Sequence, residues 1–134
     1  MPAIAARIGA ALLAAAGLAS VAGAVGLGPL VHSGVTNSER KGFYLTLINP
    51  YPGRERFRLY SVGWDSEAPA GEVLIPVPQP ALRGKSQRRL LVVATGLEPG
   101  EERRFRVCAE RLAAAGEGII HARVCSKLTA RRLG

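Results

Sequence analysis

The chain has 134 residues, a formal net charge of +8 at pH 7 and two cysteines, and aromatic residues make up 5% of it. This length is that of one domain, whose core needs no metal to hold it together. A groove for single-stranded nucleic acid needs aromatic platforms between its basic residues, so the scarcity of aromatics argues against nucleic-acid binding despite the positive charge.

The first 24 residues have the organisation of a secretory signal peptide. Arg7 precedes an apolar run over residues 8–18, and small residues follow as far as Ala24. Cleavage near Ala24 would leave residues 25–134 as an exported, periplasmic domain, and the loss of Arg7 would lower the net charge to +7. The alternative is an uncleaved membrane anchor, but Pro29 and nearby glycines interrupt the run before the roughly 20 residues that a span requires.

Seven short extended segments are predicted along the rest of the chain. In residues 42–48 and 57–64 apolar and other side chains alternate, which is the period of a strand. The fourth segment contains Pro76, Pro78 and Pro80, and since a proline lacks a backbone N–H, this segment must be an edge strand or an extended crossover. The seven segments are residues 27–35, 42–48, 57–64, 73–80, 87–95, 101–109 and 119–129.

This pattern predicts an all-β fold, an immunoglobulin-like antiparallel β-sandwich of about seven strands in a single domain over residues 25–134. Trp64 is expected in its core, together with Phe105 and Val107, which alternate with arginines in an inside/outside pattern. Only residues 109–115 have helical character, and this run is too short for more than one turn.

Cys108 and Cys125 are predicted to form a disulfide, because they are an even pair in a chain destined for an oxidising compartment. Closing a loop of this length contributes roughly 3 kcal/mol of stability. The alternative is two buried free thiols. If the last two strands form an antiparallel hairpin with these cysteines opposite each other, Glu110 faces Arg123 and forms a cross-strand ion pair.

No catalytic residue, metal site, cofactor or small-molecule substrate is predicted, so the protein is expected not to be an enzyme. Gly84-Lys85-Ser86 has the ending of a phosphate loop, but Gln79 stands where the first glycine of that motif belongs. His32 and His121 are far apart, and neither has a carboxylate or cysteine at ligand spacing.

Several short motifs follow one another between residues 43 and 132. They are Asn49 after one strand, Trp64 at the end of the next, Ile75-Pro76-Val77-Pro78, the spacing of Leu82, Gly84, Gln87 and Leu90, the turn Gly96-Leu97-Glu98-Pro99-Gly100-Glu101, and Arg104-Phe105-Arg106-Val107. In order and spacing they resemble the amino-terminal domain of the PapD-like periplasmic chaperones of the chaperone–usher pilus pathway. The resemblance covers most of the chain after the signal peptide.

The resemblance implies a way of binding. In that family the last strand of the domain offers alternating apolar residues to the unfinished sandwich of a pilus subunit, adding a strand in trans. The matching residues here are Ile120, Ala122, Val124 and Leu128. The alternative is that these residues face the protein's own core.

The resemblance also implies an anchor and a set of partners. A lysine near the end of the last strand holds the terminal carboxylate of the subunit, and Lys127 stands at its place. The family's second anchor, an arginine near the chain start, has no match, since its place falls near Ser33 and the nearest basic residue is Arg40. A disulfide between the last two strands occurs in one branch of the family. The implied partners are secreted pilin-like subunits and, beyond them, an outer-membrane usher.

Two other functions are compatible with the sequence. Classical members of the family carry a second sandwich domain, which has no counterpart up to Gly134. The protein could instead be a pilin-like or surface subunit that donates its own residues 25–35, or a secreted basic module that binds anionic polymers and releases them at high salt.

Overall fold

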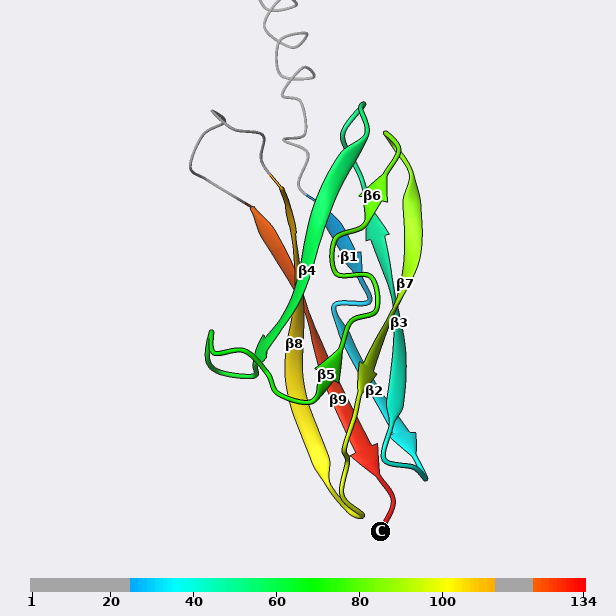
Figure 1. Ribbon diagram of the computed structural model, residues 1–134, viewed down its shortest axis with the longest axis vertical. Helices are drawn as coiled ribbons and strands as arrows, with labels where there is room; N and C mark the ends of the chain where they lie inside the picture. Colours follow the sequence, from blue (N-terminus) through cyan, green and yellow to red (C-terminus); the bar gives the residue numbers. More distant parts are fainter. Residues whose placement is uncertain (1–24, 113–121) are drawn as a thin grey trace, which may run out of the picture.

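The computed structural model describes residues 25–112 and 122–134, in which nine strands form two sheets (Figure 1). No helix occurs in these residues, and so none that is long and apolar enough to cross a membrane. The strands are β1 (Gly26–Gly28), β2 (Val31–Thr36), β3 (Lys41–Ile48), β4 (Glu55–Gly63), β5 (Val73–Leu74), β6 (Ala81–Leu82), β7 (Gln87–Ala94), β8 (Glu102–Arg111) and β9 (Arg123–Arg132).

The strand orders confirm the predicted all-β sandwich. One sheet has the order β1-β3-β7-β5 and the other β2-β9-β8-β4-β6. All neighbours are antiparallel except β2 and β9, which run parallel. The segment predicted as one strand over residues 27–35 is divided between the two sheets, because β1 pairs with β3 whereas β2 pairs with β9.

The proline-rich segment is the crossover that the sequence predicted. It leaves β5 at the edge of one sheet and enters β6 at the edge of the other. The prolines donate no hydrogen bond, but the carbonyls of Pro78 and Pro80 accept the backbone N–H groups of Leu59 and Phe57 at 2.8 and 2.9 Å. The segment therefore runs beside β4 and accepts two of its hydrogen bonds, but it does not form a continuous strand of the sheet.

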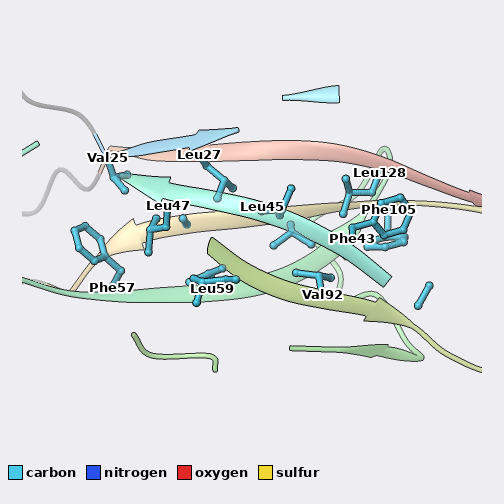
Figure 2. Packing of buried hydrophobic residues seen from close by; sticks show 14 of the residues in the cluster. Val25, Leu27, Phe43, Leu45, Leu47, Phe57, Leu59, Val92, Phe105 and Leu128 are labelled. Atoms are coloured by element: carbon cyan, nitrogen blue, oxygen red, sulfur yellow. The ribbon is translucent and has the colours of Figure 1, made fainter. Parts of the chain in front are cut away.

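The core lies between the two sheets and follows the predicted alternation. Figure 2 shows Phe43, Phe105 and Leu128 grouped at one end of it. Phe105 and Val107 are 1% and 0% exposed, as expected. The expectation for Trp64 is wrong, because it follows the end of β4, is only half-buried and lies outside the buried cluster.

The β8–β9 hairpin has the predicted register. Cys108 lies opposite Cys125 and forms the predicted disulfide, and Glu110 lies opposite Arg123. The expected ion pair between Glu110 and Arg123 is wrong, since Arg123 pairs with Glu67 at 2.6 Å. The loop after β4 folds back over the sheet and supplies that carboxylate.

The expected helical turn over residues 109–115 is also wrong where it can be examined. Residues 109–111 continue β8, because Arg111 pairs with Phe57 of β4. Residues 113–115 lie outside the described residues. Pairing with a neighbouring strand thus overrides the local preference of Ala109, Glu110 and Arg111 for a helix.

Candidate functional site

The edge of β9 is only partly covered. On one side, β9 pairs with β8 along residues 123–131. On the other side, β2 covers β9 only from Lys127 to Arg132. In the described part of the chain no strand pairs with residues 123–125 on that side. Unpaired backbone groups at a strand edge can accept a strand from another protein.

The neighbouring strand β2 presents apolar side chains at the same edge. Val31 and Val35 of β2 are 72% and 55% exposed, and Leu30 before it is 57% exposed. Val31 lies beside Lys127 in the parallel pairing. Proteins normally protect such an apolar edge from aggregation by charge or by a covering segment, so its exposure is consistent with a binding surface.

Lys127 places a positive charge on the outer face of the second sheet. Its Nζ lies 5.1 Å from the centroid of the Trp64 ring, and the guanidinium of Arg104 lies 5.7 Å from the same centroid. Arg104 pairs with Glu102 at 3.1 Å, whereas Lys127 forms no ion pair within the described residues. The ammonium is exposed and free to bind a carboxylate.

Glu67 fixes the loop that carries Trp64. It accepts hydrogen bonds from Arg123 at 2.6 and 2.8 Å and from Arg106 at 3.3 Å. The hydrogen bond from Arg123, supported by that from Arg106, lowers the pKa of Glu67 to about 2. Arg106 also donates to the carbonyl of Gly63 at 2.8 Å, so the loop is held beside Lys127 at both ends.

The four residues expected to be donated do not share one exposed surface. Leu128 is fully buried in the domain's own core, and Val124 is half-buried against it. Ala122 is exposed just before β9, and Ile120 lies outside the described residues. The cause is that β9 alternates regularly, so its even positions turn towards the first sheet wherever that sheet covers them.

For the second basic residue that would anchor a carboxylate, the structure offers Arg104 rather than a residue near the chain start. Ser33 lies opposite Thr129, and Arg40 follows the end of β2, so neither is the neighbour of Lys127 in the sheet. Arg104 shares the Trp64 ring with Lys127 and was missed by the sequence reasoning. The predicted hairpin register already implied that β8 arginines lie beside Lys127 and could have revealed it.

The described residues hold no group of three histidine, cysteine, aspartate or glutamate side chains that could bind a metal. The ring of His32 packs edge-to-face against Phe43, with 5.5 Å between the ring centroids, and this packing accounts for its position. His121 lies outside the described residues. The features of the candidate site, an open strand edge and an exposed ammonium, are those of a surface that can bind another protein.

Comparison with known proteins supports the fold. No protein-family model and no curated protein matches the sequence. Among solved structures, the Escherichia coli chaperone DraB superposes with a TM-score of 0.65 at 24% identity, and the Salmonella enterica chaperone SafB, solved with the SafA pilin, with 0.68 at 22%. A PapD-like domain of human CEP192 superposes with 0.63 at 11% identity.

The coverage of these matches shows what is shared. The match with DraB covers 81% of this chain and 55% of DraB, and the match with SafB covers 85% of this chain and 57% of SafB. This chain therefore spans a little over half the length of these chaperones. It takes in 84% of the CEP192 domain. The chain thus has the PapD-like, immunoglobulin-like fold of a pilus-chaperone amino-terminal domain.

Proposed function

We propose that the protein is a periplasmic, non-enzymatic chaperone-like factor that binds pilin-like subunits at the edge formed by β9 and β2. The observation that carries the proposal is the open backbone edge at residues 123–125 beside an ammonium, that of Lys127, with no carboxylate partner in the described residues. SafB, which has this fold, was solved as a chaperone in complex with a pilin.

In this proposal the subunit adds a strand along residues 123–125. Its backbone bonds to the free edge, while the exposed Ala122 and the half-buried Val124 offer side chains to the subunit's core. Leu128 stays in the chaperone's own core, because donating it would leave a cavity there. The donated set is therefore shorter than the sequence implies.

Lys127 sets the register of the bound strand. It lies three residues beyond Val124, roughly 10 Å along β9 at the usual rise per residue. A subunit carboxylate held there would receive a charge-assisted hydrogen bond, with Arg104 as a second cation beside the Trp64 ring. The disulfide between Cys108 and Cys125 holds the hairpin that presents this edge.

A second candidate function is a basic binding module that has kept the fold for another task. The observation that favours it is the match to the CEP192 domain, which is covered over most of its length. The third candidate, a subunit that donates its own residues 25–35, is less consistent with the structure. Both β1 and β2 are paired within the domain, so donation would require them to leave it.

The test is capture of subunits by the tagged, exported protein in the periplasm of its own host, with the captured proteins identified by mass spectrometry. Lys127→Ala should weaken capture by about tenfold or more, the effect of losing one charged hydrogen bond. Arg131→Ala is the matched control, because it removes one exposed positive charge from the same strand. Equal capture by both variants would remove the anchor role, and recovery of the protein alone would favour the binding-module function.

A further inference from the structure

A second charged site lies at the opposite end of the sandwich from Arg131. There the residue before β4, strand β6 with the turn after it, and the start of β7 line an open surface pocket of about 320 Å³, in which the arginines are exposed. Arg54, Arg83 and Arg88 line it, and these three residues are called the arginine pocket below. In Figure 1 this is the upper end of the molecule, where β6 turns into β7.

The three arginines come from three segments of the chain. In the pairing of β4 with β6, Glu55 lies opposite Leu82. Arg54 directly precedes Glu55 and Arg83 directly follows Leu82, so both arginines lie at this end of the paired strands and line the same pocket. Like charges held close together repel each other, so this arrangement has a cost that the fold itself does not require. Arg88 comes from β7 of the other sheet, two residues before the buried Leu90 and on the same face of that strand.

No acidic residue neutralises the arginine pocket within residues 25–112 and 122–134. Several other arginines do have acidic partners, such as Arg103 with Glu72 at 2.9 Å. Glu55, the acid next to Arg54 in the sequence, is engaged by Arg111 at 3.1 Å. None of the three pocket guanidiniums takes part in an ion pair or side-chain hydrogen bond with the described residues. Three positive charges therefore share one cavity without compensation.

The backbone of the pocket is fixed without any ligand. The buried side chain of Asn49 donates to the carbonyls of Leu82 and Arg83 at 3.1 and 2.9 Å. The turn that follows packs so closely that a Cβ on Gly84 would lie 1.9 Å from the carbonyl oxygen of Pro52. Only glycine fits at this position, and the turn that carries Arg83 is held in place before binding.

We propose that the arginine pocket binds a phosphate or sulfate group. A guanidinium is always charged and presents a planar set of donors that matches the oxygens of such a group. Three guanidiniums that line one pocket suit a tetrahedral oxyanion better than a carboxylate, which has only two oxygens to share. The cavity is large enough for the group to carry a substituent, as in a phospholipid headgroup. This site is separate from the β9 edge and does not depend on the proposed function.

The test is isothermal titration calorimetry of the full exported chain with inorganic phosphate and with sulfate at low salt. We expect one saturable site, weakened about tenfold or more in the Arg83→Gln/Arg88→Gln variant. The control is Arg40→Gln/Arg131→Gln, which removes the same charge from exposed residues at the other end of the sandwich. Its binding should stay close to that of the parent protein.

Two results would overturn the proposal: no saturable binding of either ion, or an equal loss of binding in the two variants, which would indicate general attraction to a basic protein. Arg88→Gln alone keeps the test valid if the double variant does not fold. Flotation with phosphatidylcholine vesicles containing phosphatidylglycerol then separates the sources. Binding that inorganic phosphate displaces supports a lipid headgroup as ligand, and phosphate binding without flotation supports a free or soluble phosphate.

Discussion

Asn49 offers a sharp test of how the fold is held, because its fully buried side chain joins the end of β3 to the turn after β6. Its Nδ2 donates to the carbonyls of Gly53, Leu82 and Arg83 at 3.0, 3.1 and 2.9 Å, and its Oδ1 accepts the N–H of Tyr51 at 3.0 Å. In Asn49→Ala the buried bond to Leu82 costs about 1–3 kcal/mol and each of the others roughly 0.5–1.5 kcal/mol. The two N–H groups of the amide are shared among the three carbonyls, so the expected loss in the free energy of unfolding is about 2–6 kcal/mol.

The assay is urea denaturation of the disulfide-bonded protein, with Asn37→Ala as the control. Asn37 is exposed, so its replacement should change stability by less than about 0.5 kcal/mol. Asn49→Asp should be at least as harmful as Asn49→Ala, because a carboxylate cannot donate and would face three carbonyl oxygens. A loss below about 1 kcal/mol for Asn49→Ala, or a neutral Asn49→Asp, would refute this reasoning.

Three further predictions follow from the outer face of the second sheet. Replacing both Cys108 and Cys125 by alanine should lower the free energy of unfolding by roughly 3 kcal/mol in urea, since their bridge closes a loop with a sequence separation of 17; an unchanged midpoint would contradict it. The pKa of Glu67 is lowered in the folded protein to about 2, so its stabilising contribution is present above its ordinary value near 4.5 and is lost as the pH falls from there towards 2. Glu67→Gln should flatten that part of the stability–pH curve, and an identical curve would contradict the ion pair with Arg123. Trp64→Leu should leave the free energy of unfolding within about 1 kcal/mol of that of the parent protein, as expected for a ring outside the core. A loss of about 3–5 kcal/mol, as for a buried aromatic residue, would contradict this.

Local alternation and the even pair of cysteines were enough to predict part of this structure. Phe105 and Val107 are buried because strand periodicity alone decides which face turns inwards. The register of Cys108 and Cys125 followed from requiring a disulfide within a simple hairpin. Both inferences concern residues that are close in sequence.

Interactions between distant segments could not be predicted in the same way. Trp64 lies outside the core because its loop is held by Glu67, whose partner Arg123 is 56 residues away. Leu128 is buried because it lies on the face of β9 that packs into the core between the two sheets. The arginine pocket joins Arg54 with Arg83 and Arg88 from further along the chain, and no local pattern in the sequence brings them together.

The most direct test of the proposed function is backbone hydrogen exchange of the protein, alone and mixed with a pilin-like subunit. If the subunit adds a strand to β9, the amides of residues 123–125 that face away from β8 should exchange about tenfold or more slowly in the complex, because they gain hydrogen bonds. The amides of β5, at the edge of the other sheet, should be unchanged. Protection at β5 or at the arginine pocket, with none at residues 123–125, would contradict binding through the β9 edge.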